Sequence, residues 1–285
     1  MDKQINTAII MTAGWGTRWL PLTKAVEKYM VPLGSRPVID WKVQECVDAG
    51  ITHIIFVVNE QHAQLKRYFS PRPVLENYLE QKGKNKWLDE IRQPQYKGIK
   101  FDYIVQPSVG IYGTAVPLNI GYDLVSEGET IAVFNADDTT FRTDGTNEVT
   151  DFFKSWRESE ASNAIMVTKL DIEDAPKYGV VAHTDDGDFI EIVEQPTVEV
   201  AKTIQNPTKN INDFIFGPEV RRICKEYIET KEDDGKEYRI TDVLTQVAKE
   251  GHGVHVYTMK GEWLDCGNPG DWLRSNQVVV GAKER

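Results

Sequence analysis

The sequence of 285 residues is poor in cysteine and carries fewer basic than acidic residues. Its three cysteines, Cys46, Cys224 and Cys266, are odd in number and far apart, which excludes a disulfide framework and a structural zinc pattern. The formal net charge is -11, whereas a general nucleic-acid surface needs clustered cations to neutralise phosphates. We therefore expect a protein of the reducing cytoplasm that has no nucleic-acid partner.

The sequence also lacks a long apolar run. The N-terminal segment "MDKQINTAIIMTAG" has an apolar part that is too short for a secretory signal, and the later run "IIFVV" is too short to span a bilayer. These absences predict a soluble protein without a membrane partner.

What the sequence does contain is an alternation of apolar, β-branched runs with helix-like segments. The predicted strands are 7–11, 51–58, 101–105, 130–134 and 164–169, and the predicted helical segments are 37–49, 60–95, 114–125 and 148–160. Such alternation predicts an α/β fold, with a Rossmann-like and mostly parallel sheet flanked by helices.

The pattern changes after residue 170. The stretch "YGVVAHTDDGDFIEIVEQP" reads as a hairpin around "DDG". Further elements follow in order: a strand at 210–216, helices after Pro218 and Thr241, a strand at 254–259 and a last helix after Pro269. No linker is evident, so we expect one domain, 1–285, in which a small C-terminal lobe of hairpin and helices shares the core of the first half.

Three unusual segments follow predicted strands: "TAGWGTRW", "QPSVGIYGT" and "NADDTT". Ligands of open α/β sheets bind outside the carboxyl ends of the strands, and glycine loops let backbone N–H groups approach a ligand. Arg18, Lys24 and Lys28 add positive charge, and the adjacent Asp137 and Asp138 offer oxygen ligands to a divalent ion. The segments together predict a phosphate site.

Two common phosphate motifs do not fit the first segment. A dinucleotide fingerprint needs a third glycine where Trp19 stands, and Pro21 follows almost at once. A Walker loop needs Gly-Lys before Ser or Thr, whereas the chain has Gly16-Thr17-Arg18. A tight strand-exit turn at Gly14 and Gly16, and a solvated turn or helix cap at Asp137, remain open as purely structural interpretations.

The stretch "GWGTRWLPLTKAVEKYM" resembles the signature G-x-G-T-R-x-x-P-x-T-x-x-x-x-K of sugar-phosphate nucleotidyltransferases. The resemblance continues in order through "VQPSVGIYGTA", "NADD", "YGVV", "VEQP", "YRITD" and "WLDCGNPGDW". The insertion "LENYLEQKGKNKWLDEI" is typical of the branch that contains the bacterial UTP:glucose-1-phosphate uridylyltransferases. Six ordered matches are more specific than any one loop.

The resemblance implies that the chain forms UDP-glucose and pyrophosphate from UTP and glucose 1-phosphate by Mg²⁺-assisted in-line attack on the α-phosphorus. It implies a nucleotide-binding half at about 1–170, a sugar-binding half at about 171–285, and a homo-oligomer, either dimer or tetramer. The residues it assigns are Arg18 and Lys28 to catalysis, Ala13, Gly14, Gly16, Thr17, Gln106 and Gly113 to the nucleotide, Gly179, Glu194, Gln195 and Asn212 to the sugar, and Asp137 and Asp265 to Mg²⁺.

Three positions depart from the family pattern. Gln195 replaces a lysine expected to touch the sugar phosphate, Glu27 replaces a proline beside the catalytic lysine, and Asn212 replaces a glycine of the sugar pocket. The candidate cations to replace the missing lysine are Lys177, Lys202 and Arg239. Two alternatives therefore stay open: a weakly active or inactive regulatory paralogue, and an enzyme for another sugar 1-phosphate. An enzyme that uses dTTP is a third alternative, because thymine and uracil differ by one methyl group.

Overall fold

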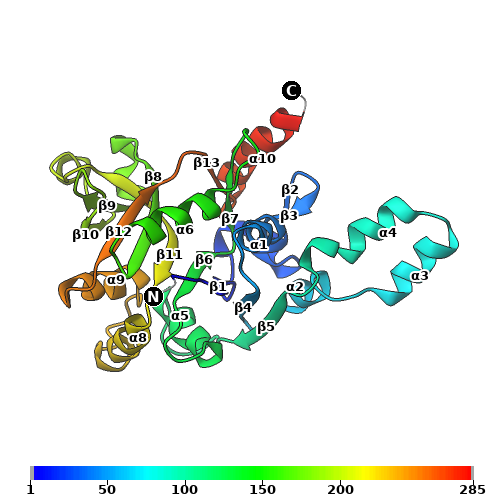
Figure 1. Cartoon of the computed structure of the whole chain (residues 1–285), viewed down its shortest axis with the longest axis horizontal. Helices are drawn as coiled ribbons and strands as arrows, with labels where there is room; N and C mark the ends of the chain where they lie inside the picture. Colours follow the sequence, from blue (N-terminus) through cyan, green and yellow to red (C-terminus); the bar gives the residue numbers. More distant parts are fainter. Residues whose placement is uncertain (1–2, 284–285) are drawn as a thin grey trace.

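The computed structural model describes residues 3–283, whose centre is a mixed sheet of nine strands (Figure 1). The strands are β1 (Thr7–Met11), β4 (His53–Val58), β5 (Lys100–Val105), β6 (Ile131–Asn135), β8 (Asn163–Lys169), β9 (Gly179–His183), β10 (Phe189–Glu194), β11 (Thr208–Phe216) and β12 (Val254–Thr258). The predicted α/β fold is confirmed, and the strand β1 has the predicted bounds.

Strands β5, β4, β1 and β6 lie side by side and are parallel. All five residues of β1 are buried, as expected for a strand covered on both faces. The antiparallel pairs all involve β9, β10 or β11, so the departure from parallel pairing begins in the second half of the chain. The predicted hairpin is β9 and β10, which extends the same sheet.

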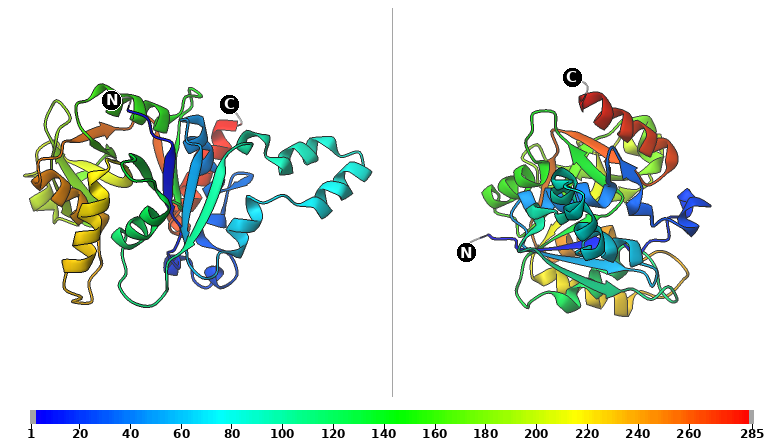
Figure 2. Two further views of the ribbon diagram at one scale, coloured as in Figure 1. Left: turned by 60° about the horizontal axis from the view of Figure 1, so that its bottom comes forward. Right: turned by 90° about the vertical axis from the view of Figure 1, so that its right-hand side faces the viewer.

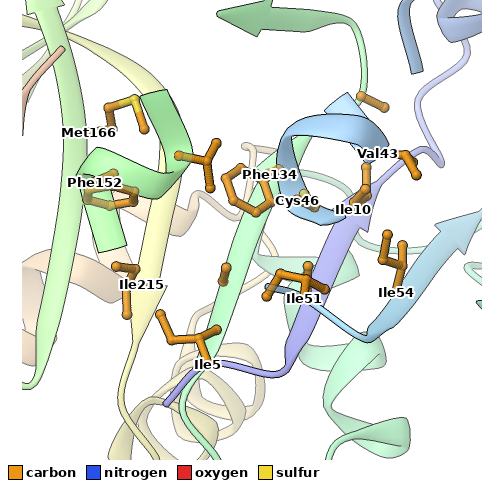
Figure 3. Close-up of a cluster of buried hydrophobic side chains, with 14 of the residues drawn as sticks. Ile5, Ile10, Val43, Cys46, Ile51, Ile54, Phe134, Phe152, Met166 and Ile215 are labelled. Atoms are coloured by element: carbon orange, nitrogen blue, oxygen red, sulfur yellow. The ribbon is translucent and has the colours of Figure 1, made fainter. Parts of the chain in front are cut away.

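Helices cover both faces of the sheet. One face packs against α1 (Val38–Asp48) and α6 (Glu148–Glu158), and Figure 3 shows part of this core, with Phe134 and Ile215 of the sheet near Cys46 and Phe152. The other face packs against the helices α5 (Ala115–Gly121), α8 (Glu219–Thr230) and α9 (Ile240–Lys249). Both cores draw residues from before and after position 170.

The predicted helical segment 60–95 forms α2 (Ala63–Tyr68), α3 (Pro73–Gln81) and α4 (Asn85–Arg92). Helices α3 and α4 form an arm that stands away from the rest of the molecule (Figures 1 and 2). Within the described residues 3–283, no helix is both long and apolar enough to cross a membrane.

Two short ribbons were absent from the sequence-based prediction. Strand β7 (Asp138–Phe141) pairs antiparallel with β13 (Glu262–Asp265), and β2 (Pro32–Leu33) pairs with β3 (Arg36–Pro37). Only Ala136 and Asp137 separate β6 from β7, and no Gly or Pro marks the break between the two strands in the sequence. The last helix, α10 (Pro269–Lys283), follows β13 and contacts it.

Candidate active site

The loop after β1 folds back on itself in three 3₁₀ turns, at Thr17–Trp19, Leu22–Lys24 and Lys28–Met30. Gly16 makes this return possible: it has φ of 63°, and a Cβ built on it would lie only 2.8 Å from Lys28 Cβ. A side chain at position 16 would therefore combine backbone strain with a clash. The return brings the Lys28 ammonium next to Gly14, within 3.4 Å of a Cβ built there.

Lys28 Nζ donates to Asp137 Oδ2 at 2.8 Å. Asp137 lies just beyond the carboxyl end of β6, the strand next to β1. Burial alone would raise the pKa of Asp137, but the charges of Lys28 and Arg18 and the hydrogen bond from Lys28 hold this pKa below its usual range. Asp137 thus stays ionised at neutral pH.

The β7–β13 ribbon brings the second predicted aspartate to the first. Asp265 faces Asp138 across the ribbon, and Cys266 N donates to Asp137 O at 2.8 Å. Burial raises the pKa of Asp265 to about 6, and the Gly267 N–H, which donates to its Oδ1 at 2.7 Å, opposes that shift. The carboxylates of Asp137 and Asp265 therefore lie close together where the ribbon ends.

The arrangement fits a divalent cation. A Cβ built on Gly267 would lie 2.8 Å from Arg18 Nη2, 3.0 Å from Asp265 Oδ1 and 3.2 Å from Asp137 Oδ2, so these groups converge on one point. Residues 3–283 contain no group of three or more His, Cys, Asp or Glu side chains placed to hold a metal ion. Two carboxylates are nevertheless the donor set that Mg²⁺ uses when waters and substrate phosphates complete its coordination.

A cavity of about 320 Å³ opens on one side of Lys28. Among the residues that line it are Ala13, Gly14, Gln106, Gly113, Tyr112 and Asn135. Gly113 has φ of 121°, and a Cβ there would lie 2.4 Å from Tyr238 O, so glycine is required. Gln106 also lines this cavity, and its buried Oε1 has no hydrogen-bond partner in the described part of the chain.

A second cavity, of about 230 Å³, lies on the other side of Asn135, which lines both. It is lined by the remaining charged and sugar-site candidates, Arg18, Asp137, Asp265, Gly179, Glu194, Gln195 and Asn212. Glu194 Oε1 accepts from Thr241 Oγ1 at 2.6 Å. Of the predicted site residues, only Gly16 and Thr17 line neither cavity, because they build the loop.

The departures from the family pattern have local explanations. Asn212 has φ of 61° at an irregularity in β11, a conformation that Asn tolerates better than most residues. Its backbone N donates to Asn210 Oδ1 at 2.8 Å, and Asn210 Nδ2 donates back to Asn212 Oδ1 at 2.9 Å. The two amides thus fix the shape of one wall of the smaller cavity.

Glu27 does not pair with the neighbouring Lys28. Its carboxylate accepts from the N–H groups of Gln64 and Leu65, at 2.9 and 3.0 Å, at the start of α2. The Gln64 side chain in turn accepts from Glu27 N and donates to Ala25 O. The Glu27 carboxylate therefore fixes the loop after β1 to the start of α2.

The cations considered as substitutes for the missing lysine lie in different places. Lys177 lines the smaller cavity and pairs with Asp174 at 2.6 Å. Lys202 pairs with Glu173 at 3.8 Å and Arg239 with Glu237 at 3.7 Å, and neither lines that cavity.

Sequence reasoning missed Lys209 and Asn135. Lys209 Nζ lies 4.5 Å from the Tyr178 ring and 4.4 Å from the Trp263 ring, both of which line the smaller cavity. Burial lowers the pKa of Lys209. Asn135 could have been identified as the last residue of the strand that leads into "ADD", whereas nothing in the sequence pointed to Lys209.

A buried lysine supports the site from behind. Lys42 of α1 is fully buried, and its Nζ lies 3.1 Å from Asp213 Oδ2, 3.4 Å from Glu45 Oε2 and 3.5 Å from Asp138 Oδ1. Asp213 follows Asn212, and Asp138 follows Asp137. The Lys42 ammonium group therefore links β11, which carries Asn212 and Asp213, to β7, which begins at Asp138.

Residues 7–280 match the family of nucleotidyl transferases. A relative from Pseudomonas aeruginosa, named UTP--glucose-1-phosphate uridylyltransferase, is 30% identical over 275 residues, covering 95% of this chain and 94% of that protein. A protein of the same name from Bacillus subtilis (strain 168) is 30% identical over 271 residues, covering 93% and 87%. The solved structure of a UTP-bound UGPase from Acinetobacter baumannii matches with a TM-score of 0.86 at 27% identity, covering 98% and 94%.

Proposed function

The chain belongs to the nucleotidyl transferase family, and from this premise we propose that it joins UTP and glucose 1-phosphate into UDP-glucose, with release of pyrophosphate. The observation that carries the proposal is the pair of cavities that share Asn135 and meet at Lys28 and Asp137. The names of similar proteins from Pseudomonas aeruginosa and Bacillus subtilis support the same reaction. Each cavity receives one substrate, and the charged groups between them receive the phosphates.

UTP occupies the larger cavity. The backbone of Ala13, Gly14 and Gly113 contacts the uracil, and the side-chain amide of Gln106 hydrogen-bonds to the base. Gly16 and Thr17 carry the loop toward the triphosphate. Because backbone groups do most of this work, the base is held by shape and by a few hydrogen bonds.

The reaction needs cations more than it needs a nucleophilic side chain. A phosphate oxygen of the sugar 1-phosphate forms a bond to the α-phosphorus of UTP, and the bond from that phosphorus to the bridging oxygen breaks as pyrophosphate leaves. Arg18 holds the departing pyrophosphate, and Lys28 holds the phosphates near the α-phosphorus. Fixed positive charges reduce the repulsion between two anionic reactants and align them for in-line attack.

Asp137 and Asp265 would hold Mg²⁺, which supplies positive charge to the phosphates when it is bound. Lys28 keeps Asp137 ionised, so one carboxylate ligand is ready at neutral pH. Gly267 lets the two carboxylates approach one point, since any side chain there would fill the space between them.

Glucose 1-phosphate occupies the smaller cavity. Gly179, Glu194, Gln195 and Asn212 contact the sugar, and Glu194 accepts from its hydroxyl groups. Gln195 supplies no charge to the sugar phosphate, so a neighbouring cation takes the place of a lysine there. Lys177 is placed for this task because it lines the same cavity.

The test is pyrophosphate release by the purified protein from UTP and glucose 1-phosphate with Mg²⁺. Galactose 1-phosphate and dTTP are run in parallel, and Asp137→Ala is the inactive control, with its folding checked by circular dichroism. We expect turnover with UTP and glucose 1-phosphate that is lost in the Asp137→Ala variant. Absence of turnover with every common sugar 1-phosphate would overturn the proposal.

A second candidate is a weakly active or inactive regulatory paralogue that keeps the nucleotide site. The uncharged Gln195 in the smaller cavity favours it. In that case Gln195→Lys raises the rate of pyrophosphate release, and an unchanged rate counts against it. Use of another sugar 1-phosphate or of dTTP is decided by the parallel assays described above.

The proposal includes a homo-oligomer, dimer or tetramer, in the cytoplasm. The exposed Tyr78 and Trp87 of the α3–α4 arm offer aromatic contacts to a second copy, and the three cysteines are buried and free, as suits a reducing compartment. Light scattering measures the assembly, and a strict monomer would contradict this part of the proposal.

A further inference from the structure

Residues 237–241, which we call the connecting segment, run from the larger cavity to the smaller one. At its first end the segment pairs with the loop that follows β5. Tyr238 N donates to Tyr112 O, and Ala115 N donates to Tyr238 O, both at 2.8 Å. Glu237 lines the larger cavity beside Gly113. The connecting segment is therefore part of the wall around the proposed nucleotide site.

The fit between the segment and the loop is tight. Ile240 N donates to Thr114 Oγ1 at 2.9 Å, which adds a third hydrogen bond to the two backbone bonds. Gly113 approaches the backbone of Tyr238 so closely that any Cβ would lie 2.4 Å from its carbonyl oxygen. The loop thus fixes where helix α9 begins, at Ile240.

At its other end the segment reaches the smaller cavity. Thr241 lies in the first turn of α9, is only 3% exposed, and donates through Oγ1 to Glu194 Oε1 at 2.6 Å. Glu194 lines the smaller cavity, and both of its carboxylate oxygens lie 3.3 Å from a Cβ built on Gly179. A carboxylate held through one oxygen keeps its other oxygen free to accept from a ligand hydroxyl.

We propose that Thr241, which the connecting segment holds in place, is a positioning residue whose hydroxyl fixes the Glu194 carboxylate for the sugar. The proposal rests on the function proposed above. A hydrogen bond to a charged acceptor restricts the carboxylate to one rotamer, so less freedom is lost when the sugar binds. Thr241 itself touches no substrate.

The experiment replaces the hydroxyl without changing the shape of the side chain. Thr241→Val removes the donor, Thr241→Ser keeps it, and Thr245→Val is the matched control, one turn further along α9, where the hydroxyl donates only to Thr241 O. The KM values for glucose 1-phosphate and UTP are measured separately. Binding of glucose 1-phosphate with UTP analogue present is followed by calorimetry, which reports on Thr241 even without turnover.

We expect Thr241→Val to raise the KM or the dissociation constant for glucose 1-phosphate about tenfold or more, with KM for UTP unchanged. Thr241→Ser and Thr245→Val should stay near the wild-type protein. An unchanged affinity for the sugar phosphate in Thr241→Val, or an equal loss for both substrates, would overturn the role of Thr241. An inactive wild-type protein that still binds glucose 1-phosphate would overturn the proposed reaction alone.

Discussion

The two cavities differ in what builds them. The larger is formed mainly by loops that follow the parallel strands β1 and β5, and its close contacts depend on glycine. The smaller is formed by charged and amide side chains on antiparallel β9, β10 and β11 and on the β7–β13 ribbon. Loops that depend on glycine dominate the larger cavity, whereas charged and amide side chains dominate the smaller one.

This difference indicates where the chain is free to change its chemistry. A backbone wall keeps its hydrogen-bonding groups when side chains change, provided that no Cβ intrudes. A side-chain wall changes its ligand with a single substitution. Two of the three departures from the family pattern, Gln195 and Asn212, line the smaller cavity, and the third, Glu27, faces α2. We therefore expect this protein to differ from other members of the family in the sugar 1-phosphate that it uses, more than in its nucleotide.

The largest expected effect concerns a charged residue of the smaller cavity. Arg18→Met removes a cation that lines the smaller cavity and makes no ion pair within residues 3–283, while Asp137 keeps its ion pair with Lys28. We expect kcat for pyrophosphate release to fall about 10²–10³-fold, with an unchanged melting temperature. Arg67→Met, an exposed site on α2, is the control. A rate close to that of the control would remove Arg18 from the proposed mechanism.

The glycine-dependent wall of the larger cavity is tested by adding one methyl group to each of two glycines in the loop after β5. Gly113→Ala places a Cβ at positive φ and against Tyr238, whereas Gly110→Ala has a similar φ, 110°, with no atom within 4 Å. Both variants carry backbone strain, about 1–3 kcal/mol.

Only Gly113→Ala should lose further stability in denaturant unfolding and raise KM for UTP, while KM for glucose 1-phosphate rises less. Equal behaviour of the two variants would mean that the close approach of Gly113 does not shape the nucleotide cavity.

Much of the fold was predictable because local signals agree with it. Buried β-branched runs such as Thr7–Met11 gave strands, and the carboxyl ends of parallel strands gave the place of the site. Arg18, Lys28 and Asp137 are far apart in the sequence, but each follows a strand of the same sheet, so their proximity could be expected. The grouping of these residues at one edge of the sheet was therefore predictable from the sequence.

The rest depended on contacts that no local pattern encodes. The β7–β13 ribbon joins segments more than 120 residues apart and has no turn signal of its own. Lys42 resembles any surface lysine of a helix in the sequence, yet it lies buried among three carboxylates. Glu27 stands next to Lys28 in the sequence, and only the position of α2 gives its carboxylate other partners.

The smallest effect concerns sugar choice. Asn212→Gly removes the amide that narrows the smaller cavity, and glycine accepts the φ of 61° without strain, so the fold should be kept. Asn206→Gly is the matched control, because Asn206 also has positive φ but is exposed and outside the cavity.

We expect Asn212→Gly to change the ratio of kcat/KM for glucose 1-phosphate over galactose 1-phosphate about tenfold, with kcat/KM for UTP unaffected. If the ratio stays constant while UTP kinetics change, Asn212 acts on the nucleotide side. The distinction between a larger cavity shaped by glycine loops and a smaller cavity shaped by side chains would then be wrong at Asn212.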